Sequence, residues 1–88
     1  MMTPSEIASK VKSILASKLD VSLAKLDMDS RLIEDLGMDS FGAIEMAFEL
    51  EDVFSVKIPD ADLQKALTVR DIVDYIVSRV SETGADKK

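Results

Sequence analysis

Apolar residues recur at helical spacing near the start of the chain, and the segment opens on signals typical of a helix start. Its apolar positions, three or four residues apart, are Ile7, Val11, Ile14 and Leu15. Thr3 suits the N-cap position, Pro4 suits the first helical position, and Glu6 completes a capping box. The pattern therefore predicts an amphipathic helix that runs to about Lys18.

The segment from about Ser40 to Phe54 has the clearest helical pattern in the chain. At 100° per residue, several apolar side chains fall within about 60° of one direction and predict a buried stripe. The stripe consists of Ala43, Met46, Ala47, Leu50, Val53 and Phe54. The opposite side mixes the large apolar residues Phe41, Ile44 and Phe48 with the acids Glu45, Glu49, Glu51 and Asp52. Either another element covers these three apolar residues, or they form an apolar contact ridge with an acidic border, a layout typical of a docking helix.

Two further helices are predicted in the last third of the chain. Pro59 and Asp60 open a short helix that reaches about Ala66. A second capping box begins at Thr68, and the stripe that follows it contains Val69, Ile72, Val73, Ile76 and Val80. Residues 81–88 are all small, polar or charged, and we expect them to form a flexible tail after a domain over residues 1–80.

The connection over residues 19–38 is long for a compact domain. Such connections are usually functional or contain a short helix, and the leucines in this one predict that it packs over the helices. Gly37 is expected to serve a turn. The stretch from Asp27 to Arg31 has the spacing of the first part of a calcium loop but lacks its central Gly and closing Glu, so no metal site is predicted.

Length and composition exclude several classes of function. The 88 residues make one small domain with a modest core. There is no His and no Cys, which excludes Ser-His-Asp catalysis and thiolate metal sites and fits a cytoplasmic protein. No apolar run approaches the roughly 20 residues of a membrane span, and the first residues lack the pattern of a secretory signal.

The net charge of −6 is concentrated in the middle of the chain. Residues 32–62 contain nine acids and one base, which gives this segment a charge of −8. An acidic chain of this kind does not bind nucleic acid, which requires a basic surface. The acidic segment is either a solvated face that aids solubility or a surface that steers basic partners toward the protein.

Ser40 lies where the irregular connection meets the most strongly helical segment, and without His it is better suited to be an attachment point than a nucleophile of the chain's own. The stretch from Asp35 to Phe41 reads Asp-Leu-Gly-Met-Asp-Ser-Phe. It resembles the phosphopantetheine attachment motif of acyl carrier proteins, usually written D-L-G-x-D-S-L. The resemblance continues through the acidic helix and the turn at Ile58 to about Val80. It implies an all-α fold, a small antiparallel four-helix bundle with a long first loop and a short third helix.

The resemblance also implies a function and a set of partners. The family attaches a 4'-phosphopantetheine arm from coenzyme A to the serine that matches Ser40, and Asp39 matches the acid that the transferase recognises. The protein itself is then not an enzyme; a separate phosphopantetheinyl transferase loads it, and acyl-loading, synthase and acyltransferase enzymes use it. Their basic surfaces are expected to dock on Phe41, Ile44, Glu45, Phe48, Glu51 and Asp52 of a monomeric carrier.

Two positions depart from the usual motif. Phe41 stands in place of the common Leu, and Gly42 stands where an acid is common. A carrier for fatty-acid synthesis and a specialised carrier for lipid or polyketide synthesis are therefore both consistent with the sequence. An aminoacyl or D-alanyl carrier of the same fold is the alternative function. A helical adaptor that only docks partners would account for the acidic ridge but not for the Asp39-Ser40 pair at a helix start.

Overall fold

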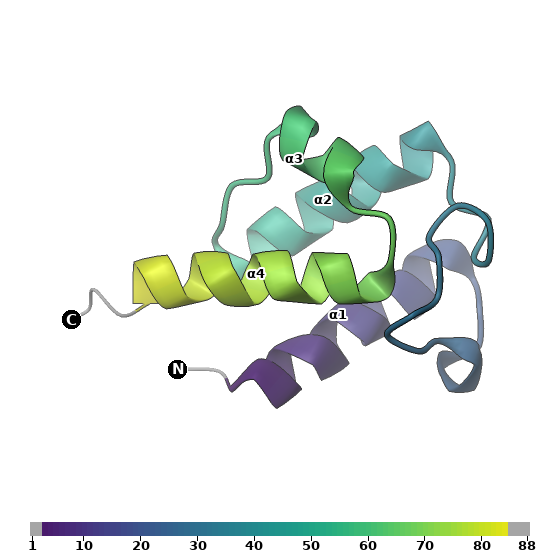
Figure 1. Cartoon of the computed structure of the whole chain (residues 1–88), viewed down its shortest axis with the longest axis horizontal. Helices are drawn as coiled ribbons and strands as arrows, with labels where there is room; N and C mark the ends of the chain where they lie inside the picture. The colour runs from purple at the N-terminus through teal and green to yellow at the C-terminus, as the bar shows by residue number, and fades with distance from the viewer. Residues whose placement is uncertain (1–2, 85–88) are drawn as a thin grey trace.

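Four α-helices and one short 3-10 helix form the part of the chain that the computed structural model describes, residues 3–84 (Figure 1). They are α1 (Pro4–Leu19), η1 (Leu23–Lys25), α2 (Ser40–Phe54), α3 (Asp60–Lys65) and α4 (Val69–Gly84). Helix α1 runs in the opposite direction to α2 and α4 and packs against both (Figure 1). The predicted all-α four-helix bundle, with its long first connection and short third helix, is confirmed.

The start of α1 has the capping box that the sequence predicts. The Thr3 hydroxyl accepts a hydrogen bond from the Glu6 amide at 3.1 Å, and the Glu6 carboxylate accepts one from the Thr3 amide at 2.8 Å. Two backbone donors that the helix leaves without an internal partner are thus satisfied, which stabilises the first turn. The helix ends at Leu19, one residue beyond the predicted end, where Asp20 turns into the left-handed region with φ 55°.

The apolar stripes of α1, α2 and α4 meet in one core. Its most completely buried side chains include Ile7, Leu15, Met46, Leu50 and Ile76. The predicted stripe of α2 is confirmed for Met46, Ala47, Leu50 and Phe54, whereas Ala43 is only half-buried. The prediction is wrong for Val53, which is 37% exposed. Val53 borders a hollow beside α1 that Ile14 lines together with serines and lysines, and this mostly polar surrounding leaves Val53 partly exposed.

The long connection between α1 and α2 packs over the bundle, as the sequence predicts. It contains η1 and buries Leu26, Leu32 and Met38. Its middle is joined to the start of α4 by backbone hydrogen bonds, which are Leu32 N to Leu67 O at 2.9 Å, Val69 N to Ser30 O at 3.1 Å and Arg70 N to Met28 O at 2.8 Å. Arg70 also pairs with Asp29 at 2.9 Å. Within residues 3–84, the one β-type pairing is the isolated bridge between Arg31 and Thr68.

The last two helices differ slightly from their predicted limits. Helix α3 ends at Lys65, one residue before the predicted end. Helix α4 continues past Val80 to Gly84, so its backbone is helical where the sequence predicted the start of a flexible tail. Residues 85–88 lie outside the described residues, and the domain boundary at residue 80 stays a prediction. In the described part of the chain, each helix is too short or too polar to cross a bilayer.

Candidate functional site

Ser40 is exposed at the first position of α2, at the end of the bundle that the long connection reaches (Figure 1). Asp39 is the N-cap residue, and its carboxylate accepts a hydrogen bond from the Gly42 amide at 2.7 Å. The Asp39 carbonyl oxygen accepts the first helical bond, from the Ala43 amide at 2.9 Å. Asp39 thus caps α2 and satisfies one of the backbone donors that the first turn of a helix leaves without an internal partner.

A tight turn at Gly37 places Asp39 and Ser40 at the N-terminus of α2. Gly37 has φ 72°, in the left-handed region, and its amide donates to the Ile33 carbonyl at 3.0 Å. The predicted role of Gly37 in a turn is confirmed, since residues with a Cβ rarely adopt this conformation. Met38 then turns inward and is only 6% exposed, which fixes the chain just before α2. The glycine and the apolar residue of the motif therefore determine where the serine emerges.

Asp35, the first acid of the motif, is exposed and joins the two ends of the turn through its contacts with Arg31. Its carboxylate accepts hydrogen bonds from the Arg31 amide at 2.8 Å and from the Arg31 guanidinium at 3.3 Å. These contacts, the backbone N–H first and the guanidinium next, lower the pKa of Asp35 below its ordinary value. Sequence reasoning missed this role, although the four-residue spacing of Arg31 and Asp35 was a signal for such a pair.

A pocket of about 300 Å³ opens beside Ser40. Its wall is mostly apolar and comes from the long connection, α2, α3 and the residues before α4, including Leu32, Met38, Ala43, Ile44, Leu63 and Leu67. Sequence reasoning did not find this pocket. Ile33 and Leu67, both in connections, line the pocket and are 66% and 65% exposed, but no periodicity in the sequence marks these two residues as neighbours.

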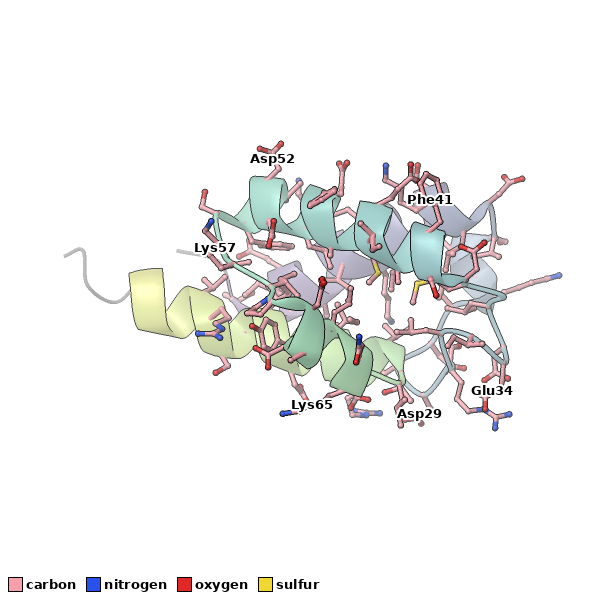
Figure 2. The ribbon with its side chains drawn as sticks, turned by 90° about the horizontal axis from the view of Figure 1, so that it is seen from above. Asp29, Glu34, Phe41, Asp52, Lys57 and Lys65 are labelled. Carbon is pink, nitrogen blue, oxygen red and sulfur yellow. The ribbon has the colours of Figure 1, made fainter. Side chains whose placement is uncertain are left out.

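Large apolar side chains line the outer side of α2. Phe41 is 69% exposed, Phe48 is 66% exposed and Ile44 is 43% exposed. Together with Glu45 and Asp52 they occupy one exposed stripe at helical spacing, and Figure 2 shows Phe41 and Asp52 near opposite ends of α2. The alternative that another element covers these apolar residues is therefore wrong within residues 3–80. This stripe is called the α2 ridge below, and its use in docking stays a prediction.

Two acids of α2 are engaged within the protein. The Glu51 carboxylate is half-buried and accepts a hydrogen bond from the Ile58 amide at 2.7 Å, which fixes the turn that leads to α3. Glu49 pairs with Lys18 of α1 at 3.7 Å. Glu51 was predicted as a border residue for docking, and the structure gives it a structural contact as well. Glu45 and Asp52 are the exposed acids of the α2 ridge.

The acids of the long connection also make contacts inside the protein. The Asp27 carboxylate accepts hydrogen bonds from the Asp29 amide at 2.9 Å and from the Ser30 hydroxyl at 3.3 Å, while Asp29 pairs with Arg70. In the described part of the chain, no three His, Cys, Asp or Glu side chains come together in a way that could hold a metal ion. These carboxylates hold the connection in place.

Comparisons with known proteins give the chain its family. A family model described as "Phosphopantetheine attachment site" matches residues 9–76. The acyl carrier protein of Thermotoga maritima is 44% identical over 80 residues, which is 91% of this chain and 99% of the relative. The acyl carrier protein of Chlorobium phaeovibrioides is 42% identical over 78 residues, 89% of this chain and all of the relative. The chain therefore belongs to the acyl carrier proteins, which are carriers and not enzymes and bear a covalently attached 4'-phosphopantetheine.

Proposed function

We propose that Ser40 carries the 4'-phosphopantetheine arm. The observation that supports this most directly is an exposed hydroxyl at the first position of α2, beside an apolar pocket and at the centre of the family's motif. In the loading step the Ser40 oxygen bonds to the β-phosphorus of coenzyme A and the bond from that phosphorus to the nucleotide half breaks. The serine proton passes to the transferase, and the nucleotide half leaves as a bisphosphate.

The surroundings of Ser40 fit this group. A phosphate on the first residue of a helix lies near the amides of the first turn and the positive end of the helix dipole. The Asp39 carboxylate is held by the Gly42 amide, which keeps the entry of α2 in one conformation. When bound, the arm supplies a terminal thiol that holds an acyl group as a thioester. Activation of the serine comes from the transferase, because the chain has no His or Cys to provide it.

The pocket favours an acyl cargo over an aminoacyl or D-alanyl cargo. Its wall is mostly apolar, and burying each methylene of an acyl chain there is worth about 0.8 kcal/mol. An aminoacyl group carries an ammonium, which loses its hydration in an apolar pocket at a large cost in free energy unless it is paired. A chain that enters this pocket from Ser40 is therefore better matched to hydrocarbon.

Partner enzymes are proposed to dock on the α2 ridge. A phosphopantetheinyl transferase must reach Ser40, and acyl-loading, synthase and acyltransferase enzymes must reach the end of the arm. The exposed apolar residues Phe41, Ile44 and Phe48 give these partners a contact area, and Glu45 and Asp52 give basic surfaces a border to pair with. Glu51 adds charge to the same border beside its contact with Ile58.

The proposal extends to the biosynthetic pathway, the cellular location and the oligomeric state of the protein. Gly42 removes a side chain from the neighbourhood of Ser40, which supports a specialised lipid or polyketide pathway beside the fatty-acid pathway. The lack of cysteine and the exposed acidic surface support a monomer in the cytoplasm. Cell fractionation and the sedimentation of the purified protein test these two points.

Intact mass tests the attachment site. Wild type, Ser40→Ala and Ser5→Ala are incubated with coenzyme A and a transferase of broad specificity. Ser5 is a matched control, because it is an exposed serine in the first turn of α1. We expect wild type and Ser5→Ala to gain one arm and Ser40→Ala to gain none. Gain of the arm by Ser40→Ala would overturn the assignment.

A further inference from the structure

Helix α3 forms one wall of the pocket beside Ser40, yet it is the least firmly packed helix of the bundle. Asp60, Leu63 and Gln64 of α3 line the pocket. None of the six residues of α3 is fully buried, and only Leu63 packs against the core, as a partly buried residue. The closely packed helix pairs join α1 to α2 and to α4, and α3 is in neither of them. Other contacts must therefore hold this wall in place.

A side-chain network ties α3 to α4. The Tyr75 hydroxyl donates a hydrogen bond to the Asp62 carboxylate at 2.8 Å and accepts one from the Arg79 Nε at 3.0 Å. The Arg79 guanidinium also pairs with the Asp62 carboxylate at 3.5 Å and lies 5.1 Å from the centroid of the Tyr75 ring. The Lys57 carbonyl, in the turn before α3, lies 3.2 Å from the same hydroxyl. One tyrosine of α4 thus contacts both α3 and its approach.

The network lies on a different side of α3 from the pocket. Asp62 and Tyr75 line a separate surface hollow between α3 and α4, and neither lines the pocket beside Ser40. The network therefore acts on a cargo only through the position of α3. We propose that the contacts among Asp62, Tyr75 and Arg79 limit how far α3 can move away from α2, and thereby set the length of acyl chain that the pocket accepts. This inference rests on the proposed function, in which the arm on Ser40 places its acyl chain in the pocket.

The strength of the network determines the size of the effect. Asp62 and Arg79 keep 30% and 37% of their side-chain surface exposed, so solvent screens their ion pair. The hydrogen bond between Tyr75 and Asp62 contributes more, and one ordinary hydrogen bond corresponds to about a fivefold change in an equilibrium. A short acyl chain fits the pocket with α3 in place. A longer chain requires α3 to move, and this movement breaks the bond.

Protection of the thioester tests the proposal. A transferase loads wild type, Tyr75→Phe and Lys65→Ala from acyl-coenzyme A with straight chains of increasing length, and hydroxylamine then cleaves the exposed thioester. Tyr75→Phe removes one hydroxyl and keeps the ring, and Lys65→Ala is a control that removes an exposed charge of α3 outside the pocket. We expect cleavage of long-chain thioesters to be about fivefold slower in Tyr75→Phe than in wild type. Short-chain thioesters should be cleaved equally, and Lys65→Ala should follow wild type at every length.

The outcomes separate this proposal from the others. An unchanged dependence on chain length in Tyr75→Phe overturns it. Faster cleavage at every length also overturns it, because the network then only stabilises the fold. If intact mass shows no arm on wild type, the proposed function fails instead.

Amide hydrogen exchange tests the movement of α3 even in protein that carries no arm. In the unmodified protein, amide hydrogen exchange in residues 60–65 should be about fivefold faster in Tyr75→Phe, while exchange in α1 and α2 stays as in wild type. Equal exchange in residues 60–65 overturns the proposal. Asp62→Asn, which removes the ion pair but keeps a side chain of the same shape, replaces Tyr75→Phe in both measurements if that variant does not fold.

Discussion

Helices α2 and α3 border the same pocket but are held by different forces. Helix α2 turns Met46 and Leu50 into the core, where each is almost completely buried, whereas α3 has no fully buried residue. Its position depends on one half-buried leucine and on polar contacts with Tyr75. The helix that presents Ser40 is thus fixed by the core, and the helix opposite is the wall of the pocket that we propose can move. A carrier needs both, because its attachment point must be constant for every partner while its cargo varies.

The largest effect that tests this comparison is the loss of core packing. Leu50→Ala should lower the free energy of unfolding by about 2–5 kcal/mol, because Leu50 is completely buried. Leu63→Ala in α3 should cost only about 1 kcal/mol, since Leu63 is half-buried. Urea unfolding measures both values. A cost for Leu63→Ala that equals that of Leu50→Ala would show that α3 is as firmly packed as α2.

The helix cap made by Asp39 and the transferase recognition proposed for its carboxylate can be separated by substitution. Asp39→Ala should lower the free energy of unfolding by about 1 kcal/mol, because the cap on the Gly42 amide is lost. Asp39→Ser keeps a capping oxygen and removes the charge, so its stability should stay close to that of wild type. Its loading by the transferase should still be slower. Loading of Asp39→Ser at the wild-type rate would contradict a recognition role for the carboxylate.

The α2 ridge gives a kinetic prediction. Replacing Glu45 and Asp52 together by Lys should slow transfer to Ser40 several-fold at low salt, since an exposed ion pair is worth about 0.2–1 kcal/mol. Added salt should reduce the difference, because it screens exposed charges. Asp74→Lys on α4 is the control, because Asp74 is also exposed and lies outside the ridge. Equal rates for all variants at low ionic strength would remove the ridge from the docking surface.

The pH dependence of stability reports on the contacts of α3. Burial first, and then the hydrogen bond to Asp62, raise the pKa of Tyr75 above its ordinary value of about 10. The folded protein therefore favours the neutral phenol. Its contribution to stability is complete below the unfolded pKa and is lost as the pH rises through the folded pKa. Tyr75 is the chain's single tyrosine, so ultraviolet absorbance of the tyrosinate measures it directly. A pKa at or below 10 in the folded protein would contradict the network.

The smallest effect is expected at Gly42. Replacing this glycine in the first turn gains up to roughly 1 kcal/mol of helix propensity. A Cβ at this position would lie 3.2 Å from an Asp39 carboxylate oxygen and 3.6 Å from the Met38 side chain, so crowding offsets part of that gain. Gly42→Asp should therefore change stability little and improve use by enzymes of fatty-acid synthesis, whereas Gly42→Ala should not. Efficient use of wild type by those enzymes would remove the case for a specialised pathway.

Many of the helices, caps and turns could be predicted from the sequence, because they depend on residues close together in the chain. The capping box at Thr3, the stripe that contains Leu50 and the turn at Gly37 each follow from residues close together in the chain. The exposure of Val53 could not be predicted, because it depends on which polar residues of α1 lie beside it. The contacts of Glu51 with Ile58 and of Tyr75 with Asp62 join different elements, and the pocket has walls from four parts of the chain. Periodicity carries no information on such contacts.

The position of the arm is the measurement that tests the central claim most directly. Wild type is loaded from coenzyme A, digested, and fragmented in a mass spectrometer so that the added mass is assigned to single residues. We predict that the whole gain lies on Ser40, the exposed serine between Asp39 and Phe41. Ser30 follows an aspartate as well, but it is only 8% exposed and its hydroxyl is hydrogen-bonded to Asp27. An arm on Ser30, or on any residue other than Ser40, would contradict the account.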